Sequence, residues 1–161
     1  MGAFAYAVVD KTALYSFYKG IDQKDVAYAV NCGSDKAVTD MSGVVYEADK
    51  DHEGGIASTE GKNHRWIVPN SDVYQSERWG KGSKFHYRIP VAEEGTFALV
   101  LKFSEVYFDM PNEKVFDVYL GQTALIPGLD ILLRAGAKLL PHDEFFDIEV
   151  KQNDGKREVY Y

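Results

Sequence analysis

The sequence has a single cysteine and no long run of basic or apolar residues. Cys32 therefore has no intramolecular disulfide partner, and no C-x-x-C spacing around it indicates a zinc site. We expect it to be a small core residue. With a net charge of -7 and no Lys/Arg run longer than a pair, the chain lacks the basic surface that tracks phosphates. We expect no nucleic-acid partner, no metal and no cofactor.

No stretch approaches the 18 or so apolar residues of a membrane span, so we expect none in this chain. The opening residues also lack the basic segment and compact apolar core of an export signal, and the sequence contains no N-x-S/T sequon. For the chain as given, these absences predict a cytoplasmic location.

Catalytic motifs are also missing. The stretch "GKGSKF" at 80–85 matches neither a phosphate-binding glycine motif nor a nucleophile elbow, and we expect a flexible turn. The four histidines are scattered, and the polar cluster at 142–144 is expected in a solvated loop before a strand. A hydrolase would need facing carboxylates, for which Glu105 with Asp117 or with Asp109 is the candidate pair. With 25 acidic residues such pairs arise by chance, so we predict a protein without catalysis.

What the sequence does have is alternation typical of β-strands. In "TFALVLKFSE", at 96–105, apolar side chains recur at every second residue, and similar patterns follow at 114–121 and 145–150. We expect "IPVAEEG" to join the first of these strands to "KFHYRIP" as a hairpin, and Asp154-Gly155 to turn the chain into a last strand.

Two other segments are less regular. Residues 129–140 predict a strand end followed by a loop or one short turn, and residues 11–18 fit either a strand or a short helix. Together the patterns predict a single all-β domain over 1–161, with two sheets forming a sandwich or a barrel.

The alternation stops where two aromatics stand side by side, at Tyr107 and Phe108. Consecutive side chains of a strand point to opposite faces, so both rings fill one core only if the strand has already ended. One interpretation is that one ring enters the core and the other covers it. The other is that both rings lie at the rim of the sandwich as a ligand platform.

Several segments, in this order and approximate spacing, resemble the malectin domain: "YAVNCGS", "EGGIAS", "VYQSERWG", "YRIPVAEEGTFALVLKFSEVYF", "KVFDVYLG" and "HDEFFDIEV". The resemblance covers about residues 27–150. It implies a jelly-roll-like, two-sheet antiparallel β-sandwich that binds glucose-containing oligosaccharides in a loop-lined cleft without catalysis. For a fragment of a typical family member it also implies the endoplasmic reticulum or the cell exterior.

The resemblance also implies ligand-binding residues. Tyr107 and Phe108 match the stacking pair of the family, and Trp79 stands where the family has a tyrosine, which keeps an aromatic plate but loses a hydroxyl. Glu60 stands where the family has another contacting tyrosine, which removes a plate and adds a charge. A contacting aspartate near the family's C-terminus has no counterpart here.

The family's closing strands also lack a counterpart after Tyr161, and a sandwich without them exposes an apolar face and an unpaired edge. A longer parent protein, or a protein partner that adds strands, would close it. A third possibility is that "SFYKGIDQKDV", at 16–26, takes that place. Two functions therefore remain open. The first is carbohydrate binding; the alternative is an intracellular protein-interaction module of a larger protein or assembly, which keeps the fold but has lost its sugar.

Overall fold

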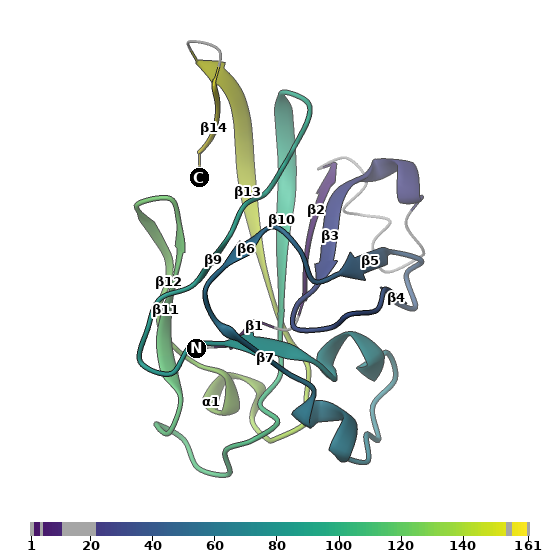
Figure 1. The fold of residues 1–161 in the computed structure, drawn as a ribbon, viewed down its shortest axis with the longest axis vertical. Helices are drawn as coiled ribbons and strands as arrows, with labels where there is room; N and C mark the ends of the chain where they lie inside the picture. The colour runs from purple at the N-terminus through teal and green to yellow at the C-terminus, as the bar shows by residue number, and fades with distance from the viewer. Residues whose placement is uncertain (1, 4, 11–21, 154–155, 161) are drawn as a thin grey trace.

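The computed structural model describes residues 2–3, 5–10, 22–153 and 156–160, and these form mostly β-strands (Figure 1). The all-β fold class is confirmed. The strands are β1 Gly2–Ala3, β2 Ala5–Asp10, β3 Val26–Asn31, β4 Val38–Thr39, β5 Val45–Ala48, β6 His52–Glu53, β7 Ile56–Ser58, β8 Glu77–Trp79, β9 His86–Tyr87, β10 Gly95–Phe103, β11 Val115–Leu120, β12 Thr123–Asp130, β13 His142–Asn153 and β14 Lys156–Tyr160. Within these described residues, the helical elements are α1 Ile131–Ala135 and the 3-10 turns η2 Gln23–Asp25, η3 Glu60–Asn63 and η4 Ser71–Tyr74.

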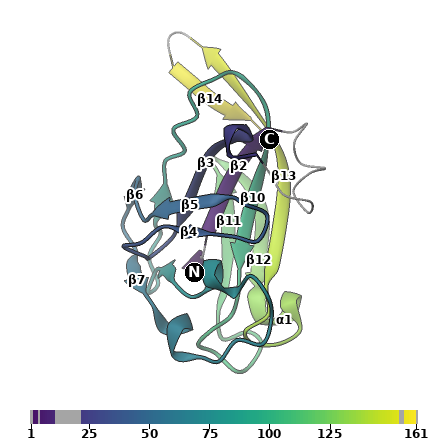
Figure 2. The same cartoon turned by 90° about the vertical axis from the view of Figure 1, so that its right-hand side faces the viewer.

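A seven-stranded sheet with the order β14-β13-β10-β2-β3-β5-β4 forms the main layer. Its neighbouring strands are antiparallel, except that β3 and β5 run parallel. Smaller sheets are β1-β8-β7, β11-β12 and β6-β9. The β11-β12 pair lies to the left of the main sheet in Figure 1 and behind it in Figure 2, so it forms a second layer. The arrangement is sandwich-like.

Strand β2 lies in the middle of the main sheet, between β10 and β3. Its alternating residues enter two apolar clusters: Tyr6 and Val8 in one, and Ala5, Ala7 and Val9 in the other, all buried. A strand that is buried on both faces has no solvent side, which explains its continuous small and apolar sequence.

Strand β2 is a contribution of the chain's own N-terminal segment to the main sheet, and the prediction that closing strands come from a longer parent protein or a partner stays a prediction. The chain itself fills the centre of the sheet with residues 5–10. Of the other candidate segment, 16–26, residues 16–21 lie outside the described residues, and Asp22–Val26 form η2, its N-cap and the first residue of β3. The stretch 11–18, for which the sequence left a strand or a short helix open, also lies outside the described residues.

Of the other local predictions, two are confirmed and two are wrong. The hairpin joining 84–90 to β10 is wrong, because β9 pairs with β6. The final hairpin is confirmed by the β13-β14 pairing, although its turn residues 154–155 are not described. The short turn after β12 is confirmed as α1, which Gly136 ends with a φ of 85°. The 142–144 cluster begins β13 and is not a loop.

Cys32 is confirmed as a core residue, since it is fully buried in the cluster that contains Tyr6 and Val8. Burial raises the pKa of its thiol to about 12, so the side chain stays protonated at neutral pH. Among the described residues, no helix has the length and apolar character to cross a membrane.

Candidate functional site

The loop of residues 104–114, which we call the platform loop, follows β10 and carries the two adjacent aromatics. Glu105 and Val106 are buried, whereas the side chain of Tyr107 is 64% exposed and Phe108 is partly exposed. The two ring centroids lie 5.0 Å apart with the ring planes at 79°. Because β10 ends at Phe103, the strand's alternation no longer determines where either ring points.

The carboxylate of Glu105 holds the backbone of both aromatics from inside the loop. Its Oε1 accepts hydrogen bonds from the N–H of Tyr107 at 2.8 Å and of Phe108 at 3.0 Å. The carbonyl of Glu105 accepts another from the N–H of Leu139 at 2.9 Å. Hydrogen bonds to a buried charged acceptor are stronger than those between neutral groups, so the two aromatics are fixed at their backbone.

Lys114 joins this loop to β8. Its Nζ lies 3.1 Å from Oε2 of Glu105 and 3.3 Å from Oε2 of Glu77, and each of the three side chains is less than one tenth exposed. Burial raises the pKa of the Glu77 carboxyl, and Lys114 opposes that rise. The same Nζ lies 6.0 Å from the centroid of the Phe108 ring, at the limit of a cation–π contact.

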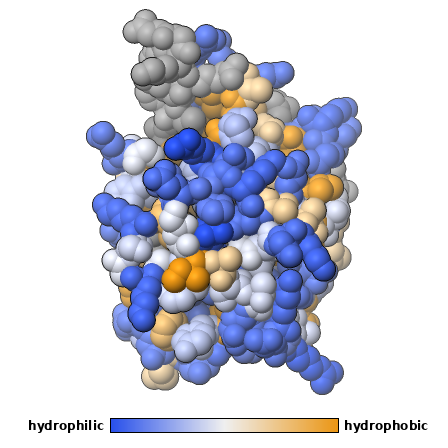
Figure 3. All heavy atoms as spheres, in the orientation of Figure 1, coloured by the Kyte–Doolittle hydropathy of each residue, from blue (hydrophilic) through white to orange (hydrophobic). Residues whose placement is uncertain are grey.

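Trp79 lies two residues after Glu77 on β8, so the two side chains share a face of that strand. It pairs with Gly2 of β1 on one side and with Ile56 of β7 on the other. Ile56 is half exposed, and Figure 3 shows a small hydrophobic island over this sheet among hydrophilic side chains. The chain of contacts through Glu77 and Lys114 therefore connects the strand of Trp79 with the platform loop.

Glu60 opens η3, directly after β7. Its N–H donates to Oγ of Ser58 at 3.2 Å, and its carboxylate accepts from Nδ2 of Asn63 at 3.1 Å. Nε2 of His64 lies 3.6 Å from the other carboxylate oxygen. These contacts stay within residues 58–64, so Glu60 is linked to Trp79 through the β7-β8 pairing, in which Ser58 is opposite Glu77.

Three further residues position the platform loop, and sequence reasoning missed them. Nζ of Lys138 donates to the carbonyl of Tyr107 at 2.8 Å and to Oδ1 of Asp109 at 3.0 Å. Asp130 accepts from the N–H of Asn112 at 2.6 Å while capping α1. The third residue is Lys114, whose ion pairs with Glu105 and Glu77 are described above. An aspartate before a helix is a recognisable N-cap signal, but lysine pairing across the fold leaves no local pattern.

The candidate catalytic carboxylates have structural contacts instead. Glu105 is buried and ion-paired with Lys114, and Asp109 is paired with Lys138. Asp117 accepts the N–H of Gly128 at 2.7 Å. Within the described part of the chain, no group of three His, Cys, Asp or Glu side chains could hold a metal ion.

The fold and site define an all-β sandwich domain with aromatic side chains at its rim, held by buried ion pairs. The family model described as "Malectin domain" matches residues 26–158. The chain therefore belongs to the malectin domain family, as its resemblance predicted. Strand β2 lies outside the matched range.

Individual proteins of this family are also similar in sequence to the chain. The chain is 39% identical over 131 residues to Malectin-A of Xenopus laevis, covering 79% of this chain and 46% of that protein. It is 35% identical over 140 residues to Malectin of Danio rerio, covering 84% and 47%, and 35% identical over 133 residues to Malectin of Homo sapiens, covering 80% and 44%. The chain thus spans about half the length of these curated relatives. No solved structure matches it significantly.

Proposed function

We propose that this domain is a non-catalytic carbohydrate-binding module that recognises glucose-containing oligosaccharides through Tyr107, Phe108 and Trp79. The observation that carries the proposal is that Tyr107 is exposed on a fixed backbone. The residue is 64% exposed, while its N–H is bonded to the carboxylate of Glu105 and its carbonyl to the ammonium of Lys138. An exposed ring on a fixed backbone loses little conformational freedom when a ligand stacks on it.

The chemistry of the platform suits a sugar. A pyranose ring has apolar C–H faces and a rim of hydroxyls, so it is bound by aromatic plates with a few polar groups around them. Tyr107 and Phe108 meet nearly at right angles and form a corner with one plate on each side. The indole of Trp79 adds a third plate and an N–H donor.

In this proposal Glu60 accepts hydrogen bonds from sugar hydroxyls. Its side chain is 37% exposed, and a carboxylate has acceptor sites beyond those used by Asn63 and His64. Compared with an aromatic plate at this position, a carboxylate gives up stacking area and gains directional hydrogen bonds. We therefore expect a different preference among glucose linkages from that of a site with a tyrosine there.

A protein-interaction function is the second candidate, and exposed apolar side chains favour it. Ile56, Tyr107 and Met110 are 50%, 64% and 63% exposed. Aromatic residues and methionine are enriched at protein interfaces, so the same platform would fit an apolar peptide segment of another protein.

Calorimetric titration with maltose and nigerose tests the first function. We expect saturable binding by the wild-type protein, and a loss of affinity of about tenfold or more for Tyr107→Ala, because a central stacking ring is removed. The control is Tyr119→Ala, which removes another exposed tyrosine, on β11.

Equal affinity of the Tyr107→Ala protein would contradict the assigned site. If the wild-type protein binds no glycan on an array but binds a defined protein partner through Tyr107, the second function replaces the first.

A further inference from the structure

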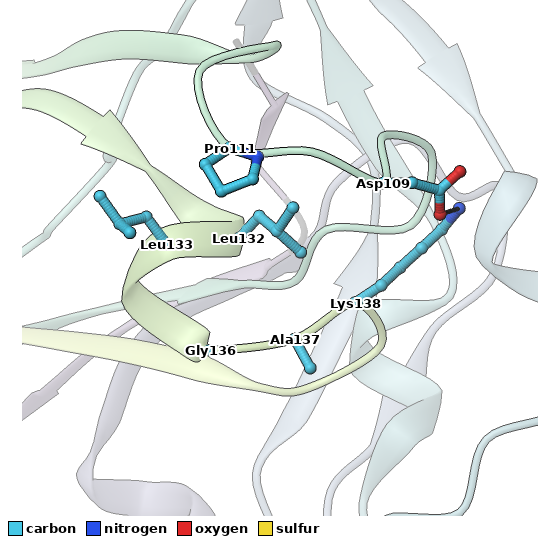
Figure 4. Close-up of a pocket in the computed structure, with 7 residues that line it drawn as sticks. All are labelled: Asp109, Pro111, Leu132, Leu133, Gly136, Ala137 and Lys138. Carbon is cyan, nitrogen blue, oxygen red and sulfur yellow. Dashed lines mark hydrogen bonds and ion pairs between the residues drawn. The ribbon is translucent and has the colours of Figure 1, made fainter.

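A hollow of about 370 Å³ lies between the platform loop and α1 (Figure 4). This volume is at the lower end of the range of ligand sites, about 300–1,000 Å³. Its lining comes from the platform loop, from α1 and from the turn that follows the helix, and includes Asp109, Pro111, Leu132, Leu133, Ala137 and Lys138.

The hollow is linked to the two aromatics by residues of its lining: Asp109 directly follows Phe108 in the chain, and Lys138 contacts the backbone of Tyr107. The Nζ of this lysine donates both to the carbonyl of Tyr107 and to Oδ1 of Asp109, and Figure 4 shows the side chains of Asp109 and Lys138 pointing toward each other. One ammonium group thus contacts the backbone of the exposed ring and a carboxylate that lines the hollow.

The lining combines two kinds of surface. Leu132, Leu133 and Pro111 are apolar, and Leu133 is 64% exposed. At the edge, the side chain of Asp109 is 80% exposed, so its carboxylate still has acceptor capacity beyond its bond to Lys138. The Lys138 ammonium has three hydrogens, two of which are used by the bonds described above. An apolar wall beside an exposed acceptor and donor matches a pyranose, with its C–H faces and neighbouring hydroxyls.

We infer that this hollow is an extension subsite for the next glucose units of an oligosaccharide whose terminal units stack on Tyr107 and Phe108. The inference rests on the proposed carbohydrate-binding function and adds the length of the ligand to it. The charge pair at the edge offers both a donor and an acceptor, which suits the hydroxyls of a neutral sugar.

Calorimetric titration with unbranched gluco-oligosaccharides of two, three, four and five units tests the subsite. We expect affinity to rise about fivefold or more once the chain is long enough to reach the hollow. Asp109→Ala removes the exposed acceptor, and Ala137→Leu fills the hollow from an exposed position. Both variants should lose the gain with length, and Ala137→Leu, which leaves the contacts of the platform loop in place, should bind the disaccharide as the wild type does. Arg134→Ala, on α1 but outside the lining, should keep the gain.

Each outcome decides one of the two proposals. If the wild-type protein binds the disaccharide and longer chains no more tightly, or if both variants retain the gain, the subsite is wrong and carbohydrate binding stands. If the wild-type protein binds none of these saccharides, the proposed function fails and the subsite fails with it.

Discussion

At the scale of single residues, the group of Glu77, Lys114 and Glu105 decides how the platform is supported. Two carboxylates and one ammonium are buried together, so one negative charge is not matched within the group. Burying such a charge is costly, and the raised pKa of Glu77 expresses that cost. Glu105 has two backbone N–H donors in addition to Lys114, which makes it the better stabilised of the two carboxylates.

The raised pKa of Glu77 predicts how stability depends on pH. Its contribution to the free energy of unfolding is fully present below the ordinary pKa of 4.5 and is lost as the pH rises through the higher folded value. Glu77→Gln removes this titration. The free energy of unfolding of the variant minus that of the wild type should therefore increase between about pH 4 and about pH 7. Denaturant unfolding at both pH values measures this difference.

The control for net charge is Glu53→Gln, because the side chain of Glu53 is 67% exposed. A difference for Glu77→Gln that stays constant with pH, or that matches the control, would show that Glu77 does not titrate abnormally in the folded protein.

At the scale of elements, the platform loop is a turn fixed at several points. Lys114 ties it to β8, Lys138 and Leu139 tie it to the turn after α1, and Asp130 ties Asn112 to the N-terminus of α1. Loops with few packed contacts open at low free energy, whereas one held by buried ion pairs opens less often. The exposed ring of Tyr107 therefore stands on a support that is unusually well fixed for a surface loop.

Glu105→Gln tests this support. The amide retains an acceptor for the N–H groups of Tyr107 and Phe108 but loses the ion pair with Lys114. We expect a cost of about 1–3 kcal/mol in the free energy of unfolding, because hydrogen bonds to a charged group become hydrogen bonds to a neutral one. Saccharide affinity should fall as well, since the two rings are then less well held.

Denaturant unfolding and calorimetric titration measure the two effects. Glu113→Gln is the matched control, because it changes an exposed glutamate of the same loop whose carboxylate accepts a single N–H, that of Met110. Equal stability and equal affinity of the two variants would mean that Glu105 does not support the platform.

At the scale of the whole molecule, β2 connects the two halves of the main sheet. It pairs with β10 on one side and with β3 on the other, and its register places Val8 between Leu99 and Tyr28. Strand β1 continues the same segment to β8, beside Trp79. The N-terminal segment therefore belongs both to the centre of the core and to the border of the candidate site.

A charge in β2 tests whether the core depends on this strand. Val8 is fully buried, so Val8→Asp should cost about 3 kcal/mol or more or abolish cooperative unfolding. Ala27→Asp introduces the same charge at an exposed position of β3 and should change stability by less than about 0.5 kcal/mol. Denaturant unfolding distinguishes the two results. If Val8→Asp unfolds at the same midpoint as the wild type, β2 is not a core strand in solution.

The sequence by itself determined the class of fold, the strand patterns at 96–105, 114–121 and 145–150, which fall within or overlap β10, β11 and β13, and the short turn after β12. These depend on local periodicity and on residues such as Gly136, so they are visible in a single segment. It also indicated that Tyr107 and Phe108 lie where a strand has ended, because an interrupted alternation is a local feature as well.

Only the tertiary structure decided which strands pair and what holds the platform. Residues 5–10 form the centre of the sheet, and β9 pairs with β6. Glu105, which the sequence offered only as one member of a chance carboxylate pair, is a buried support of the platform loop. Each of these outcomes joins segments far apart in the chain. Local patterns cannot encode them, since the free energy of a buried strand or ion pair depends on the partner that the fold brings to it.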